Sequence, residues 1–167
     1  MDFASFVRRD LAALSGYAYV LTGDRHQAQD LVQDTLVRLA RVWDRVDPAG
    51  NPSAFARTTM VRLHLSALRR ARLWRRSLPV LAVADPARDP AYERVEDLEL
   101  LRAALRQLSP PQRAVVALTY YDDHDDASIA RILRRRPGAV RALRHRALLR
   151  LRAALGDPAS VDGRRLP

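Results

Sequence analysis

The chain has 167 residues, and its 29 basic residues, all of them arginine, outnumber 19 acidic ones to give a formal net charge of +10. The absence of cysteine excludes a disulfide scaffold, a thiolate zinc site and a cysteine nucleophile. No apolar run approaches the ~20 residues that a bilayer requires, and the first residues show no signal-peptide pattern, so we expect a cytoplasmic protein without membrane insertion. The excess positive charge predicts a polyanionic partner, with nucleic acid favoured over an anionic membrane.

The first half of the chain predicts three helices. Apolar residues recur at helical spacing over residues 3–21 and again over 26–46, with a Thr-Gly-Asp break between the two segments. A loop with two prolines over 47–52 precedes Ser53, which we expect to be the N-cap of a third helix over 54–75.

The second half begins with residues 77–95, whose three prolines and lack of helical pattern predict a flexible linker. Four further helices are predicted after it. The first covers residues 98–108. The second begins at the two prolines 110–111, with Ser109 as its N-cap, and the last two cover residues 127–133 and 138–155.

These elements predict an all-α protein of two small helical domains, the second containing a helix-turn-helix. We place the first domain at residues 1–76, the linker at 77–95 and the second domain at 96–156. We expect the tail, residues 157–167, to be disordered.

Arginines gather in one acid-free segment of each predicted domain. Seven lie in residues 57–76 and nine in residues 131–152. A solvated helix face would mix the two signs of charge, so the pattern favours two segments that bind nucleic acid. The alternative is codon bias in a GC-rich genome, which would produce arginine-rich helices without such a partner.

Residues 127–133, a turn at 134–137 and the basic helix after it have the order of a helix-turn-helix. In this motif the second helix enters the major groove, where arginine can bridge guanine O6 and N7. The side chains that we expect to contact duplex DNA, at base edges or phosphates, are Arg135, Arg136, Arg141, His145 and Arg146. An ordinary α-hairpin with a solvated arginine face is the alternative, and a left-handed Arg134 in the turn would cost on the order of 1 kcal/mol.

Four polar residues form a stripe on the predicted second helix, opposite its apolar face. They lie at i, i+3, i+4 and i+8, and they are Asp30, Gln33, Asp34 and Arg38. The stripe is either a solvated helix face or a surface on which a partner docks.

No motif in the sequence predicts catalysis, a metal site or a cofactor. Residues 122–126 contain four aspartates and His124, but the spacing and glycine of an EF-hand are missing, so we expect a helix-capping role. A nucleophile elbow, a P-loop and a GxGxxG motif are absent, so we predict that the protein is not an enzyme.

Four segments occur in a fixed order: DLVQDTLVRLARVW, NPSAFARTTMVRLHLSALRRARLWRR, LRAALRQLSPPQRAVVALTYYDD and SIARILRRRPGAVRALRHRALLRLR. With a linker between the second and the third, they resemble the extracytoplasmic-function (ECF) sigma factors, the smallest members of the sigma-70 family. The nearest likeness is to the actinobacterial SigE-like group. The resemblance covers about residues 3–155.

The resemblance implies a dissociable subunit of bacterial RNA polymerase that directs the enzyme to specific promoters and helps to open the minus-ten DNA. It implies docking on core polymerase through the polar stripe, and reading of the minus-thirty-five duplex by the five helix-turn-helix residues named above. Contacts to the minus-ten element are implied for Asn51, Arg57, Arg62, His64, Arg69 and Arg70. Unpaired bases need stacking partners, for which Phe55 and Trp74 are candidates, although a core position is favoured for Phe55.

The sequence departs from the family pattern in three places. Arg62 stands where asparagine is common, residues 134–136 replace a Gly-Cys-Ser-like turn, and Arg144 stands where a small or apolar residue is usual. Family members are often held by an anti-sigma factor, so such a protein is an expected partner beside core polymerase and promoter DNA.

Two other functions are alternatives. A stand-alone helix-turn-helix repressor or activator would dimerise and bind duplex DNA without polymerase. An amphipathic protein of the membrane surface is disfavoured, because the basic helices lack a broad apolar face to insert.

Overall fold

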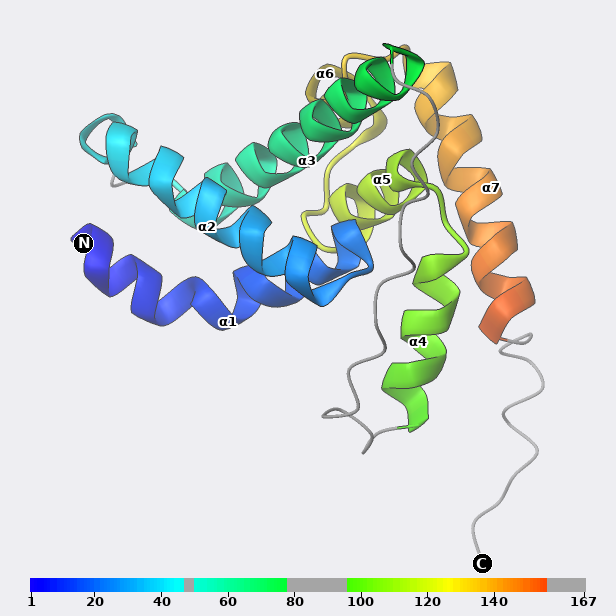
Figure 1. The fold of residues 1–167 in the computed structure, drawn as a ribbon, viewed down its shortest axis with the longest axis horizontal. Coiled ribbons are helices and arrows are strands. Elements are labelled where there is room, and N and C mark those ends of the chain that lie inside the picture. The colour runs from blue at the N-terminus through cyan, green and yellow to red at the C-terminus, as the bar shows by residue number, and fades with distance from the viewer. Residues whose placement is uncertain (47–49, 78–95, 156–167) are drawn as a thin grey trace, which may run out of the picture. The chain divides into compact units, whose positions relative to one another are not determined.

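The computed structural model describes residues 1–46, 50–77 and 96–155, and across these ranges the chain is helical, with no strand. The predicted all-α class is thus confirmed. The chain divides into two compact units, Met1–Pro86 and Ala87–Pro167 (Figure 1). The expected tail, residues 157–167, lies outside the described residues. The expected linker, residues 77–95, does so too, except for Ser77, which is the last residue of a helix.

Three α-helices and a short 3-10 helix build the first unit. They are α1 (Phe3–Thr22), α2 (Arg25–Val42), η1 (Trp43–Arg45) and α3 (Pro52–Ser77). The Asp2 carboxylate caps α1 by accepting from the Ser5 amide at 2.7 Å, and Asp24 caps α2 in the same way. Gly23 ends α1 with φ of 70°, a conformation open to glycine, which explains the break predicted there.

The start of α3 differs from the prediction that Ser53 is its N-cap. The side-chain oxygen of Asn51 accepts from the Ala54 amide at 3.0 Å, so Asn51 is the cap and Pro52 is the first helical residue. The Ser53 hydroxyl instead donates to the Asp10 carboxylate and thereby links α3 to α1. The prediction was wrong because asparagine caps as well as serine, and proline at the first helical position favours the earlier start.

The core of the first unit is apolar and aromatic. Its fully buried side chains come from all three α-helices and include Phe6, Leu14, Tyr17, Leu21, Leu39, Met60 and Val61. The rings of Phe3 and Phe6 lie 5.3 and 5.0 Å from that of Trp43, so the 3-10 helix is fixed against the start of α1.

Four helices build the second unit. They are α4 (Glu96–Arg106), α5 (Pro110–Tyr120), α6 (Asp126–Leu133) and α7 (Pro137–Leu155). Val115 and Leu118 of α5, Ile129 of α6 and Val140 of α7 are fully buried and form the centre of this core. The arrangement of α6, a turn and the longer α7 is the predicted helix-turn-helix.

Local chemistry fixes the helix ends of the second unit much as the sequence predicts. The Ser109 amide donates to Gln112 Oε1 at 2.9 Å in a capping box that opens α5. Asp125 caps α6 by accepting from the Ser128 amide at 2.9 Å. Arg134 ends α6 in the left-handed region, with φ of 52°, and the Arg135 amide closes the turn onto the Ala130 carbonyl at 2.9 Å.

Candidate polymerase and nucleic-acid interfaces

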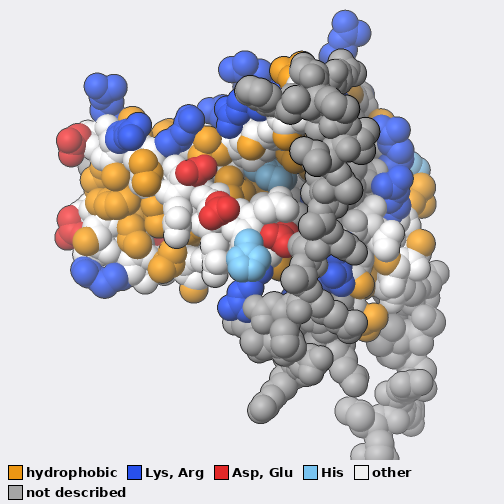
Figure 2. Space-filling view, viewed as in Figure 1, with side chains coloured by type: hydrophobic (Ala, Val, Ile, Leu, Met, Phe, Trp, Pro, Cys, Tyr) orange, Lys and Arg blue, Asp and Glu red, His pale blue; other side chains and the backbone are white. Residues whose placement is uncertain are grey.

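The polar stripe of α2 faces solvent. Asp30, Gln33, Asp34 and Arg38 are all exposed, whereas Leu31, Val32, Thr35 and Leu39 on the opposite side of α2 are buried. Val37, an exposed apolar residue, lies on the same side as the stripe. Figure 2 shows acidic side chains over this helix. The structure thus brings the four residues together on one accessible face that carries both charge and some apolar surface.

Arginines line the accessible side of α3. Arg62, Arg69 and Arg70 are exposed, and Figure 2 shows basic side chains along this helix. Arg57 is only partly exposed, and its guanidinium carbon lies 5.9 Å from the centre of the Tyr17 ring on α1. Arg57 therefore joins two helices in addition to any contact that it makes with DNA.

Two other residues expected at the minus-ten element are placed differently from these arginines. Asn51 is exposed, but its side chain caps α3. His64 is buried, with 7% of its surface exposed, which favours a packing role over contact with a strand. The contact predicted for His64 stays a prediction, and we do not include the residue in the proposed DNA-binding set.

The expectation that Phe55 packs in the core is wrong. Its side chain is 47% exposed on the first turns of α3, while its neighbour Ala56 is fully buried. An exposed ring is available for stacking on an unpaired base. Trp74, the other stacking candidate, lies within α3, and its side chain is outside the described part of the structure.

The five residues expected to meet duplex DNA in the second unit are all exposed. Arg135 and Arg136 lie in the turn before α7, and Arg141, His145 and Arg146 lie on α7 itself. Figure 2 shows basic side chains over α7 as well as over α3. The exposed positive charge of the second unit therefore includes the helix that a helix-turn-helix places in the major groove.

An ion pair between α6 and α7 escaped the sequence analysis. Both terminal nitrogens of the Arg144 guanidinium donate to the Asp126 carboxylate, and the Nη2–Oδ2 distance is 3.2 Å. The two residues are 18 positions apart, so no helical periodicity connects them. The only signal in the sequence was that Arg144 departs from the small or apolar residue expected at its position.

Two further arginines of the second unit also stabilise the fold by donating hydrogen bonds to backbone carbonyls. Arg113 on α5 is 8% exposed and donates to the carbonyls of Leu105 and Leu108 at 3.4 and 3.2 Å, and its burial lowers the pKa of the guanidinium. Arg150 on α7 donates to the Gln107 carbonyl at 3.2 Å. These donors bind carbonyls in the last turn of α4 and in the two residues that follow it, where helix carbonyls lack intrahelical partners. Arg150 belongs to the segment 131–152 that was predicted to bind nucleic acid, and no role was predicted for Arg113.

The aspartate-rich segment between α5 and α6 caps a helix, as predicted. The pKa of Asp125 is lowered because its carboxylate accepts hydrogen bonds from Ser128. In the parts of the chain that the structure describes, no three acidic or histidine side chains gather as a metal ion would need. No helix in these same parts is long and apolar enough to cross a bilayer.

Comparison with known proteins identifies both units. The family model for Sigma-70 region 2 matches residues 6–73, and the model for Sigma-70, region 4 matches residues 98–151. The chain is 32% identical to the RNA polymerase sigma-E factor of Streptomyces avermitilis, over 99% of this chain and 91% of that protein. It is 31% identical to the ECF RNA polymerase sigma factor SigL of Mycobacterium tuberculosis, over 87% and 84% of the two chains.

Solved structures agree with these relatives. The sigma factor RpoE of Bartonella quintana, crystallised with the anti-sigma factor NepR, matches with a TM-score of 0.68 and 27% identity over 94% of this chain and 98% of that one. The PhyRSL–NepR complex of a Sphingomonas species shares the fold, with a TM-score of 0.56 and 18% identity over 92% and 88% of the chains. With one helical unit matching region 2 and the other matching region 4, the chain belongs to the sigma-70 family and, within it, to the ECF RNA polymerase sigma factors.

Proposed function

We propose that this alternative sigma factor, which directs RNA polymerase to promoters, divides the work among three separate surfaces. The stripe on α2 docks on core polymerase, the arginines of α3 hold the minus-ten strand, and the turn and α7 read the minus-thirty-five duplex. The observation that carries the proposal is how charge is distributed over the exposed helix faces. Helices α3 and α7 carry exposed arginines and contain no acidic residue, whereas the exposed face of α2 presents the carboxylates of Asp30 and Asp34. All three helices lie largely within the segments that match regions 2 and 4.

The α2 stripe suits a protein partner better than a nucleic acid. Asp30 and Asp34 are exposed carboxylates that repel phosphates, and the exposed Val37 between Asp34 and Arg38 offers apolar area to a binding surface. Charge complementarity with a basic patch on the polymerase would give the contact its orientation and speed its formation.

The arginines of α3 are suited to binding single-stranded DNA. Arg62, Arg69 and Arg70 form a solvent-facing row that can follow a sugar-phosphate backbone, and the exposed ring of Phe55 lies at the beginning of the same helix. A basic track with an aromatic side chain is the usual means by which proteins hold unpaired DNA without catalysis. In this proposal the protein has no enzymatic activity of its own and works in the cytoplasm with the chromosome.

An anti-sigma factor is a proposed partner as well. The structures of RpoE and PhyRSL that resemble this chain were both solved with NepR, which is named as an anti-sigma factor in the first of them. A regulator of that kind would keep the surfaces on α2 and α7 from the polymerase and from DNA.

The decisive experiment combines purified chain with purified actinobacterial core RNA polymerase. Co-purification is measured first, and transcription from a library of genomic fragments is then mapped by sequencing the 5′ ends of the transcripts. We expect binding to core and initiation at a set of promoters that share two upstream elements. Absence of both binding and chain-dependent initiation would overturn the proposal. Specific binding to a duplex by the chain alone, as a dimer, would favour a stand-alone repressor or activator instead.

A further inference from the structure

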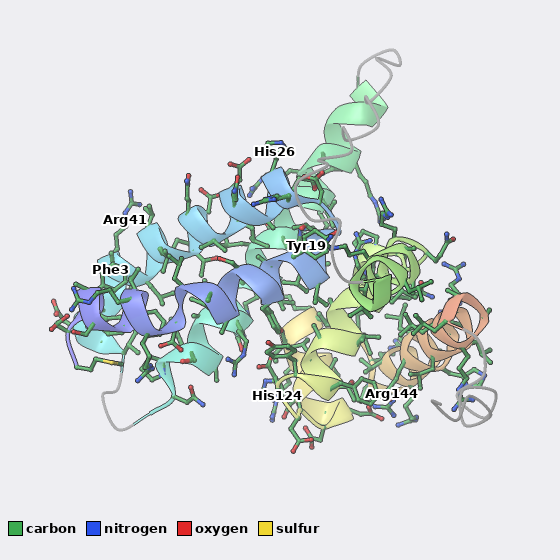
Figure 3. The ribbon with its side chains drawn as sticks, turned by 90° about the horizontal axis from the view of Figure 1, so that it is seen from below. Phe3, Tyr19, His26, Arg41, His124 and Arg144 are labelled. Carbon is green, nitrogen blue, oxygen red and sulfur yellow. The ribbon has the colours of Figure 1, made fainter. Side chains whose placement is uncertain are left out.

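Asp126 and Arg144 connect the two helices of the helix-turn-helix by two hydrogen bonds. Asp126 is the first residue of α6, and Arg144 lies near the middle of α7, where Figure 3 labels it. Arg144 Nη1 donates to Asp126 Oδ1, and Nη2 donates to Oδ2 at 3.2 Å. Their side chains are only 28% and 23% exposed, so solvent screens the pair less than it screens a surface ion pair.

The pair acts at the end of α6 that is farther from the turn. Near the turn, the buried side chains of Leu133 and Val140 and the backbone bond from Arg135 to Ala130 hold the two helices. Asp126 lies seven residues before Leu133, which is about 10 Å along a helix axis. A paired carboxylate and guanidinium fix orientation as well as distance. The ion pair is therefore a second point of contact, away from the turn, that constrains how α7 can rotate relative to α6.

We propose that Asp126 and Arg144 are positioning residues for the minus-thirty-five contact, and that Arg144 itself does not bind DNA. Arg141 lies one helical turn before Arg144, and His145 follows it directly. Any rotation of α7 would carry both of these side chains away from the base edges that they address. The proposal rests on the proposed function, because it assumes that α7 reads a duplex.

Whether Asp126→Asn strengthens or weakens DNA recognition distinguishes a positioning role from simple charge repulsion. Removing a carboxylate from a DNA-binding surface ordinarily strengthens binding, because the carboxylate repels phosphates. If Asp126 positions α7, Asp126→Asn has the opposite effect and weakens recognition of the minus-thirty-five element. Asp123→Asn is the matched control, since Asp123 is an exposed carboxylate three residues earlier, and asparagine tolerates its φ of 54°.

A second substitution asks whether Arg144 touches DNA. Lysine can replace arginine at a phosphate, but it cannot make two parallel hydrogen bonds to one carboxylate. A positioning role therefore predicts that Arg144→Lys and Arg144→Met lose similar amounts of selectivity. A phosphate contact predicts that Arg144→Lys keeps most of the function.

The test uses the full chain as holoenzyme with core polymerase. The template is a promoter found in the mapping experiment, with its minus-ten element kept and its minus-thirty-five hexamer randomised. The enrichment of the preferred hexamer among transcripts is measured, together with co-purification with core and thermal melting followed by circular dichroism. We expect about fivefold or greater loss of enrichment in Asp126→Asn and Arg144→Lys, because a displaced helix loses at least one base contact. Core binding is expected to stay unchanged, and Asp123→Asn to match or exceed the original chain.

Two outcomes overturn the proposal. Enrichment in Asp126→Asn that equals or exceeds that of the original chain overturns the positioning role. Full enrichment in Arg144→Lys with loss in Arg144→Met shows that Arg144 contacts DNA, and it also overturns the proposal. If Asp126→Asn fails to fold, Arg144→Lys, which keeps the charge, carries the test alone. A wild-type chain that initiates no transcription would defeat the proposed function instead.

Discussion

The arginines of α3 in the first unit and several arginines of the second unit differ in their exposure and in their structural role. On α3 of the first unit, Arg62, Arg69 and Arg70 are exposed, and the helices around them meet through an apolar and aromatic core. In the second unit, Arg113 is 8% exposed and binds helix-end carbonyls, and Arg144 is paired with a carboxylate. Composition therefore overstates the charge that the second unit offers to DNA. The acid-free run of nine arginines that predicted a binding segment includes two, Arg144 and Arg150, that also hold the fold together.

The largest effect is expected from reversing a charge on α2, a substitution that tests the docking surface separately from both basic surfaces. Asp34→Arg is expected to weaken core binding by about 3 kcal/mol, or roughly a hundredfold, because it places like charges together at a complementary interface. Titration of labelled chain with core polymerase measures the change. An unchanged affinity in Asp34→Arg would contradict the docking assignment.

Gln29→Arg provides the control for this charge reversal. Gln29 is an exposed, uncharged residue of α2 that does not belong to the stripe, and it lies about 140° around the helix axis from Asp34. An arginine there adds positive charge to the same helix but directs it away from Asp34. We therefore expect a much smaller change in affinity. Gln29 adjoins Gln33, four residues later, so equal weakening by both variants would mean that core polymerase responds to charge anywhere on the exposed face of α2 rather than to Asp34 in particular.

The second prediction compares a buried arginine of the second unit with an exposed arginine of the first. Arg113→Met is expected to destabilise the second unit by about 1 to 3 kcal/mol, because the Leu108 carbonyl loses its donor and the Leu105 carbonyl keeps only the Leu108 amide. Arg62→Met, an exposed arginine on α3, should stay within about 0.5 kcal/mol of the original chain.

The chain itself provides the probes for this experiment. Both tryptophans, Trp43 and Trp74, belong to the first unit, so their fluorescence follows that unit, whereas circular dichroism follows all helices. Guanidinium unfolding of Arg113→Met should shift the dichroism curve and leave the fluorescence curve in place. A shift of both curves by the same amount would show that the units unfold together.

The third prediction contrasts how the two basic surfaces bind. Arg141→Gln is expected to lose about 1 to 3 kcal/mol and to relax selectivity at one minus-thirty-five position, as a base contact would. Arg69→Gln is expected to weaken binding of all minus-ten sequences alike and to reduce the salt slope by about 1, as a phosphate contact would. Binding of holoenzyme to variant promoters at several salt concentrations measures both effects. Uniform weakening by Arg141→Gln would assign α7 to phosphate binding.

The smallest effects are expected from removing the aspartate N-caps of α1 and α6. Asp2 and Asp125 each accept hydrogen bonds from a serine three residues later, which lowers the pKa of both carboxyls below the ordinary 3.8. A lowered folded-state pKa adds stability that is present above about pH 4 and is lost as the pH falls through the folded value. Asp2→Ala and Asp125→Ala should therefore lower the melting temperature at pH 7 and make it less dependent on pH below about 4.

The two caps should differ in the size of this effect. Asp125 begins a helix of 8 residues and Asp2 one of 20, so Asp125→Ala should affect the melting of its unit more. Melting curves at neutral pH and at about pH 3 measure the difference. Equal sensitivity in the two variants would show that tertiary packing, and not the cap, holds α6.

Sequence reasoning worked where local chemistry decides the structure. The break at Gly23 and the cap Ser109 follow from residues close to each helix end and were predicted, and Asp125 lies in the segment 122–126 that was predicted to cap a helix. It failed at the start of α3, where Asn51 and Ser53 are both good caps and only Ser53 has a partner on another helix, Asp10. The choice between them depends on a tertiary contact that no local pattern reveals.

The candidate surfaces were predictable only in part, for the same reason. Helical periodicity placed the α2 stripe on an exposed face, because its apolar side is well marked. On α3 the pattern is weaker, and it misplaced Phe55, which is exposed. The partners of Arg113, Arg144 and Arg150 include atoms on other helices, so the sequence indicated their charge but not its use.

The left-handed conformation of Arg134 has a consequence for how this protein can change. Glycine at that position would relieve a backbone cost on the order of 1 kcal/mol, but it would remove an exposed positive charge next to Arg135 and Arg136. A mutation there cannot improve both folding stability and attraction to DNA. Selection for tighter promoter binding and selection for heat resistance would thus favour different residues in the same turn.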